Sequence, residues 1–129
     1  MRMAKKKILV ADDDPNIVKL IKARLEANNY EVITAADGEE CLQKISAEKP
    51  DLLILDVLMP KADGYNVLIG MNEIKALTGE MPIVPVIVLT ALSDPRVKNM
   101  IEKEEIKDYV VKPFESEELL SKIRKALGE

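Results

Sequence analysis

The stretch "LLILDVLMP", residues 52–60, is apolar except for the aspartate at position 56. A short apolar run of this kind is typical of a strand that is buried on both faces of a parallel sheet. A carboxylate without a partner would be costly in the middle of such a strand. We therefore expect Asp56 to lie where the strand emerges from the core at the edge of the sheet, next to groups that compensate its charge.

Short apolar runs alternate with amphipathic segments along the rest of the chain. This pattern predicts strands at 6–11, 30–35, 51–56, 86–90 and 107–112, and helices at 15–29, 37–49, 63–77, 94–105 and 116–129. Asp14 is predicted to cap the first helix, because it directly precedes Pro15 at the first helical position. Five strands alternating with five helices indicate an α/β fold, a parallel sheet with helices on both faces.

The bulk composition is that of one compact domain. The chain has 129 residues, of which 47% are hydrophobic and 33% charged, so residues 1–129 are expected to form a single domain with a real core and no output domain. The net charge is −4 and acids and bases are mixed, which argues against direct binding of nucleic acid. The basic cluster Lys5–Lys7 is interpreted as a solubilising flank of the first strand.

The numbers of cysteines and histidines limit the reactive groups and metal ligands that this chain can offer. Cys41, the single cysteine, falls in a helical pattern and is predicted to be a small core residue. The sequence has no histidine, which excludes histidine metal sites, histidine general bases and a phosphohistidine donor within this chain. No signal peptide and no run of about 20 apolar residues is present, so we expect a cytoplasmic protein without membrane insertion.

Polar residues follow four of the five predicted strands. The first strand ends in Asp12-Asp13-Asp14, the third in Asp56, the fourth in Thr90 and the fifth in Lys112. The second strand ends in Thr34-Ala35-Ala36, which contains no charged residue. Since ligands of open parallel sheets bind beyond the carboxyl ends of the strands, these polar groups are expected to share one edge of the sheet.

The charges at this edge suggest a phosphoryl-transfer site. Asp12, Asp13 and Asp56 would repel one another unless a cation were present, and oxygen ligands of this kind suit Mg²⁺. Lys112 and Thr90 could contact phosphoryl oxygens, and a carboxylate can itself be a nucleophile that forms an acyl phosphate. Taken one at a time, the two N-terminal aspartates could be turn residues, the threonine a strand-end hydroxyl and the lysine a solvated side chain.

Four segments in this order resemble the receiver domain of two-component response regulators. They are the acidic pair in "ILVADDDP", the phosphoacceptor segment "LLILDVLMPKADGY", the Thr-Ala pair in "VIVLTA" and the lysine-proline pair in "DYVVKPF". The resemblance covers essentially the whole chain. It implies a doubly wound, flavodoxin-like sheet of strand order 2-1-3-4-5.

The resemblance also implies roles for individual residues. Asp56 would be the phosphoacceptor and would bind Mg²⁺ together with Asp12, Asp13 and the backbone carbonyl of Leu58. Thr90 and Lys112 would contact the phosphoryl oxygens, and the Lys112–Pro113 bond would be cis.

Regulation is implied in the same way. Thr90 and Tyr109 would form the switch that alters the surface made by the fourth helix, fifth strand and fifth helix. The donor would be the phosphohistidine of a sensor histidine kinase or phosphotransfer protein, and the target a downstream protein or an output domain in trans. Tyr109 could equally be a tyrosine packed at the edge of the sheet.

Two leucines depart from the polar residues that some relatives carry. Leu58 follows Asp56 by two positions, and Leu92 follows Thr90 by two. We expect both side chains to shield the acyl phosphate from water and make self-dephosphorylation slow. The measurement is loss of a radioactive phosphoryl label in Mg²⁺ buffer, and loss within seconds would contradict shielding.

Two other classes of function compete with this interpretation. One is a Mg²⁺-dependent phosphatase or phosphotransferase that uses an aspartyl phosphate; such an enzyme usually needs a second acid close after its nucleophile, whereas Val57 and Leu58 follow Asp56. The other is a receiver-like binding module that is not phosphorylated, which the complete set of polar residues disfavours. We therefore expect a phosphoacceptor rather than an enzyme.

Overall fold

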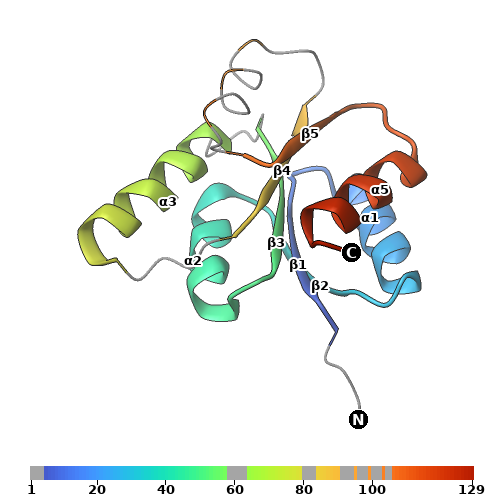
Figure 1. Ribbon diagram of the computed structural model, residues 1–129, viewed down its shortest axis with the longest axis horizontal. Coiled ribbons are helices and arrows are strands. Elements are labelled where there is room, and N and C mark those ends of the chain that lie inside the picture. The colour runs from blue at the N-terminus through green and yellow to red at the C-terminus, as the bar shows by residue number, and fades with distance from the viewer. Residues whose placement is uncertain are drawn as a thin grey trace.

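The computed structural model describes residues 5–57, 64–79, 84–90, 95, 99, 103 and 106–129. Within them the chain alternates between strands and helices (Figure 1). In chain order the elements are β1 (Lys7–Ala11), α1 (Pro15–Ala27), β2 (Glu31–Ala35), α2 (Gly38–Glu48), β3 (Leu52–Asp56), α3 (Gly64–Thr78), β4 (Val86–Thr90), β5 (Asp108–Val111) and α5 (Ser116–Ala126).

The five strands form one parallel sheet in the order β2-β1-β3-β4-β5. Figure 1 shows α1 and α5 on one face of this sheet and α2 and α3 on the other. The predicted fold class and strand order are confirmed. Most of the helix predicted at 94–105 lies outside the described residues, which contain four helices.

Alternation of side chains along β3 explains why this strand is apolar up to its last residue, Asp56. All five of its residues are buried. Leu53 and Leu55 belong to the apolar cluster that also contains residues of α2 and α3, whereas Leu52 and Ile54 belong to the cluster that contains residues of α1 and α5. A strand covered by helices on both sides exposes no face to water, so neither face accepts polar residues.

The helix ends differ from the predictions by one to three residues. Asp14 caps α1 as predicted, and its side chain accepts a hydrogen bond from the Asn16 N–H. Asp37 lies outside α2 as its N-cap, and Lys49 ends that helix in the left-handed conformation at φ 48°. Helix α5 ends at Ala126 rather than at position 129. Among the described helices, none is long and apolar enough to cross a bilayer.

Each outer strand of the sheet has one carbonyl capped by a lysine of an adjacent helix. Lys44 of α2 donates a hydrogen bond to the carbonyl oxygen of Thr34 in β2. Lys122 of α5 donates one, 2.6 Å long, to the carbonyl oxygen of Tyr109 in β5. Unpaired carbonyls on edge strands invite pairing with other chains, so these two lysines protect the edges of the sheet.

Cys41 is a core residue, as predicted. Its side chain is fully buried in the cluster under α2, and burial raises the pKa of the thiol to about 12. Because the thiolate is the form that attacks a disulfide reagent, we expect Cys41 of the folded protein not to react with such a reagent at pH 8. In urea the same thiol should react within minutes. Fast labelling of the native protein would contradict the buried position.

Candidate functional site

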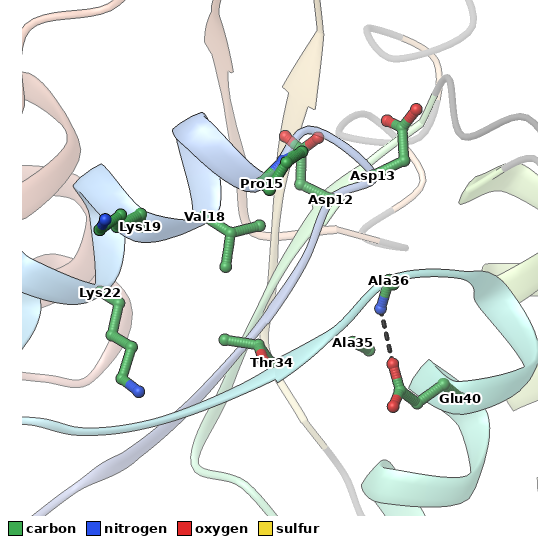
Figure 2. Close-up of a pocket in the computed structure, with 10 residues that line it drawn as sticks. All are labelled: Asp12, Asp13, Pro15, Val18, Lys19, Lys22, Thr34, Ala35, Ala36 and Glu40. Carbon is green, nitrogen blue, oxygen red and sulfur yellow. Dashed lines mark hydrogen bonds between the residues drawn. The ribbon is translucent and has the colours of Figure 1, made fainter.

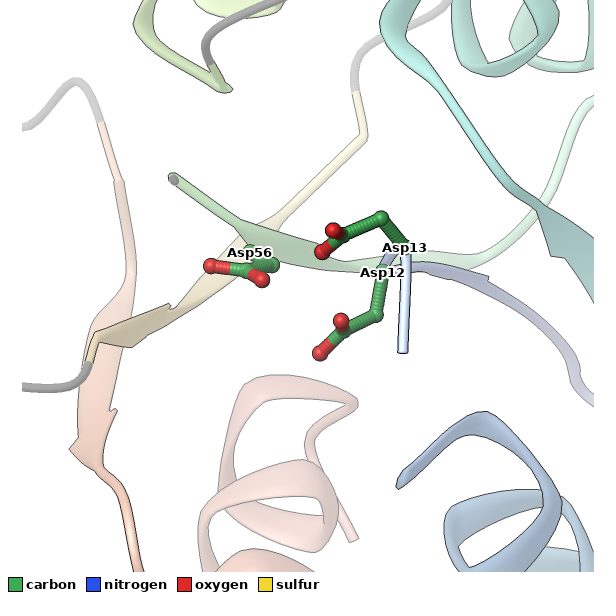
Figure 3. Close-up of side chains that lie close together, drawn as sticks. All are labelled: Asp12, Asp13 and Asp56. Atoms are coloured by element: carbon green, nitrogen blue, oxygen red, sulfur yellow. The ribbon is translucent and has the colours of Figure 1, made fainter. Parts of the chain in front are cut away.

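Three carboxylates meet at the carboxyl ends of two neighbouring strands. Asp12 and Asp13 follow β1 directly, and Asp56 is the last residue of β3. The two strands are paired in register, with Ala11 opposite Leu55. One oxygen from each carboxylate lies within 4.8 Å of the others (Figure 3). The structure thus brings together the three acids that the sequence placed at this edge.

The three acids differ in exposure, which the sequence did not predict. Asp13 is exposed, whereas only 2% of Asp12 and 4% of Asp56 is accessible to solvent. Asp56 is at the edge of the sheet, as expected, but the expectation that it leaves the buried region is wrong. Because Asp56 is almost fully buried, the compensation of its charge has to come from the protein or from a bound cation.

Lys112 supplies part of this compensation. Its ammonium group donates hydrogen bonds to Oδ2 of Asp12 at 2.8 Å and to Oδ2 of Asp56 at 3.2 Å. The remaining oxygen of Asp12 accepts the Asp14 N–H at 2.9 Å. Lys112 follows β5 and precedes a cis peptide bond to Pro113, as the family resemblance implied. One cation therefore joins two buried acids from different strands.

The pKa directions reflect burial at Asp12 and contact with two acids at Lys112. Burial raises the pKa of Asp12 above the ordinary value of 3.8, and its bonds to Lys112 and to the backbone do not fully offset this. Burial disfavours the charged form of Lys112, but its hydrogen bonds and its attraction to Asp12 and Asp56 raise its pKa. The acids hold the lysine proton firmly, while one lysine does not neutralise three acids.

Thr90 and Tyr109 lie on neighbouring strands next to this cluster. Thr90 ends β4 and is 2% exposed, and its carbonyl oxygen accepts the Lys112 N–H at 2.7 Å. Tyr109 in β5 is opposite Val88, two residues before Thr90, and its ring packs partly against the core under α2 and α3. Both predicted switch residues are therefore on the strands that flank the site.

A lysine that the sequence analysis did not single out holds Tyr109. The ammonium group of Lys122 lies 5.4 Å from the centre of the Tyr109 ring and 3.5 Å from Oδ1 of Asp108. An attraction between the cation and the ring adds to the hydrogen bond that caps the strand. No sequence signal distinguishes this lysine from its neighbours, because the contact depends on how α5 crosses the end of the sheet.

The two remaining predicted residues, Leu58 and Leu92, lie outside the described residues. The predicted carbonyl ligand and the predicted shielding of the phosphoryl group therefore stay predictions.

The acid cluster fits a small hard cation. Ligand oxygens around Mg²⁺ are about 2.1 Å from the ion, so they are roughly 3 to 4 Å from one another. Carboxylate oxygens within 4.8 Å of one another reach that spacing with small side-chain movements. Since the donors are oxygens only, with no nitrogen or sulfur, the ligand type favours Mg²⁺ over zinc or copper.

A comparison with protein families matches residues 8–124 to the response regulator receiver domain. Among curated proteins, the chain is 47% identical over 129 residues to a probable transcriptional regulator, ycf27, of Cyanophora paradoxa, with 98% of this chain and 50% of that protein covered. It is 41% identical to the alkaline phosphatase synthesis transcriptional regulatory protein PhoP of Bacillus subtilis, with 95% and 48% covered. The chain thus spans about half the length of the curated relatives it matches.

Solved structures agree with this match. The chemotaxis protein CheY4 of Vibrio cholerae superimposes with a TM-score of 0.83 at 31% identity, covering 96% of this chain and 100% of that one. The response regulator TrrA of Thermotoga maritima, solved in complex with Mg²⁺ and BeF, gives a TM-score of 0.76 at 38% identity, covering 95% and 99%.

Proposed function

We propose, from the premise that this chain belongs to the response regulator receiver family of two-component signalling, that Asp56 accepts a phosphoryl group. The observation that carries the proposal is the position of Asp56. It is the buried last residue of the central strand, it is joined to Lys112, and two further carboxylates lie within 4.8 Å. A carboxylate so placed is surrounded by groups that bind phosphoryl oxygens.

The transfer exchanges one bond for another. A carboxylate oxygen of Asp56 attacks the phosphorus of a phosphohistidine on a partner protein, so an O–P bond forms while the N–P bond breaks. The electron pair of that bond stays on the imidazole nitrogen of the partner. The donor has to be another protein or a small phosphodonor, because this chain contains no histidine.

The surrounding residues stabilise the charge on the transferring group. The ammonium group of Lys112 already contacts Asp56 and can donate a hydrogen bond to one phosphoryl oxygen. The Thr90 hydroxyl can donate a hydrogen bond to another. Asp12, Asp13 and Asp56 would hold Mg²⁺. When bound, this ion supplies positive charge that offsets the acids and the incoming phosphoryl group.

Phosphorylation would be read out through β4 and β5. Movement of Thr90 toward the phosphoryl group would leave room that Tyr109 fills, because the two residues are on paired strands. Lys122 contacts both the carbonyl oxygen and the ring of Tyr109, so a movement of this tyrosine would change the surface of β5 and α5. We propose a phosphoacceptor module that signals through protein contacts with a kinase and a downstream target, rather than a multiple-turnover enzyme.

The experiment is intact-mass measurement after incubation with Mg²⁺ and acetyl phosphate. We expect the mass of one added phosphoryl group on the wild-type chain, none on Asp56→Asn, and none on the wild type when EDTA removes the metal. Asp51→Asn is the matched control, since Asp51 is an exposed aspartate that directly precedes the same strand. It should be phosphorylated like the wild type.

Three outcomes would overturn the proposal. Sustained hydrolysis of small phosphoesters would indicate a phosphatase, and absence of any adduct with an intact fold would indicate a binding module without phosphorylation. An adduct that persists in Asp56→Asn would place the acceptor elsewhere.

A further inference from the structure

The end of β2, which contributes no polar side chain to the acid cluster, borders a cavity of about 360 Å³. The cavity lies between α1 and the turn from β2 to α2, and its lining includes Pro15 and Val18 on one side and Ala35 and Ala36 on the other. Figure 2 shows Val18 pointing from α1 toward Thr34 of β2.

Two of the three acids that line this cavity, Glu40 and Asp12, are already engaged. Glu40 accepts the Ala36 N–H at 2.7 Å and lies 3.5 Å from the ammonium group of Lys44. Asp12 is bound to Lys112 and to the backbone of residue 14. Asp13 is at the far end of the cavity in Figure 2 and belongs to the acid cluster. The body of the cavity therefore holds no acid that is available to a ligand.

A lysine supplies the charge that remains available. Lys22 of α1 lines the cavity, and Figure 2 shows its side chain extending toward β2, whereas Lys19 is directed away from Thr34. Within the part of the chain that the structure describes, the Lys22 side chain makes no hydrogen bond or ion pair. The cavity thus offers an apolar wall of Pro15, Val18, Ala35 and Ala36 and a cationic group at one side.

From this arrangement we propose that the cavity between α1 and β2 binds a small organic monoanion, with an apolar body against Val18 and Ala36 and a carboxylate or sulfonate group at Lys22. The volume is within the range of small-molecule sites, which are mostly apolar with a few polar groups that fix orientation. A polyanion such as a nucleotide fits less well, because Asp13 and the rest of the acid cluster would repel a second negative group.

An occupant would lie against the segment that carries two of the three cluster acids. The Asp12 N–H donates to the carbonyl oxygen of Ala35 at 3.2 Å, so the cavity wall and the phosphoacceptor site share a hydrogen bond. Binding itself does not require phosphoryl transfer. Its test is therefore independent of the proposed function.

The probe is 2-naphthoate, with its neutral isostere 2-naphthamide as the comparison, and the readout is the backbone amide NMR spectrum of the whole chain. We expect millimolar or tighter binding of 2-naphthoate, as is usual for a fragment of this size, with shifts at residues 18, 22, 34 and 36. Naphthamide should bind about tenfold more weakly, because it cannot pair with Lys22.

Two variants and a control decide the assignment. Lys22→Met keeps the apolar stem but removes the charge, and it should reduce the preference for naphthoate over naphthamide to about twofold or less. Ala36→Leu fills the cavity from an exposed position and should abolish binding of both compounds. Lys125→Met, an exposed lysine on α5, should bind like the wild type. The proposal is wrong if no shifts occur at about 10 mM naphthoate, or if all variants bind it equally.

Discussion

Replacing Lys112 by Met is expected to lower the free energy of unfolding in Mg²⁺-free buffer at pH 7 by about 3 kcal/mol. The reason is that Asp12 and Asp56 are almost fully buried and share this single ammonium group, which is itself 18% exposed. Removing the ammonium group takes away the positive charge that these two buried carboxylates contact. Methionine keeps the length of the side chain, so the loss reports on charge rather than on packing.

The dependence on pH and metal follows from the same contacts. The pKa of Lys112 is raised in the folded protein, so its stabilising contribution is fully present below its ordinary pKa of 10.5. That contribution is lost only when the pH rises through the higher folded-state pKa. Saturating Mg²⁺ should restore part of the stability of Lys112→Met, because a cation bound by the three acids replaces the missing charge.

Urea unfolding followed by circular dichroism measures both effects. Lys107→Met is the matched control, since Lys107 directly precedes β5 and its side chain is exposed. We expect a change of less than about 0.5 kcal/mol for the control variant. Equal stabilities of the two variants without metal would show that the hydrogen bonds of Lys112 do not compensate the buried acids.

The strands were predictable because each carries a local signal, whereas their order was expected only from the resemblance to the receiver family. A run such as residues 52–56 can remove its apolar side chains from water only inside a sheet that is covered on both faces. The carboxyl ends of parallel strands have to meet at one edge of the sheet. The cap at Asp14 was predictable for the same reason, since it depends on neighbours in sequence.

The contacts within the site were harder to predict. Asp12 and Lys112 are 100 positions apart, and their 2.8 Å bond depends on the order of four strands between and around them. The sequence likewise does not show that Asp12 is buried while the adjacent Asp13 is exposed. Burial of Asp56 and the hold of Lys122 on Tyr109 were missed because both depend on how segments distant in the sequence pack against each other.

Replacing Leu53 by Ala should cost about 3 kcal/mol of unfolding free energy. Leu53 is the second residue of the central strand β3, opposite Leu9 on one side and Val86 on the other, and it is fully buried in the cluster under α2 and α3. Alanine would leave a cavity that the surrounding strands cannot close without breaking their hydrogen bonds. A loss of this size is a large fraction of the stability of a typical domain.

The control for this prediction is Leu20→Ala, the same change on the surface of α1, where the leucine is 51% exposed. Alanine forms helices at least as well as leucine, so a change within about 0.5 kcal/mol is expected there. Urea unfolding of both variants isolates the contribution of burial, because the deleted atoms are identical. If Leu53→Ala lost less than about 1 kcal/mol, the core around β3 would have to be loosely packed. Packing of β3 would then not be what holds Asp56, three residues further along the same strand, in its position.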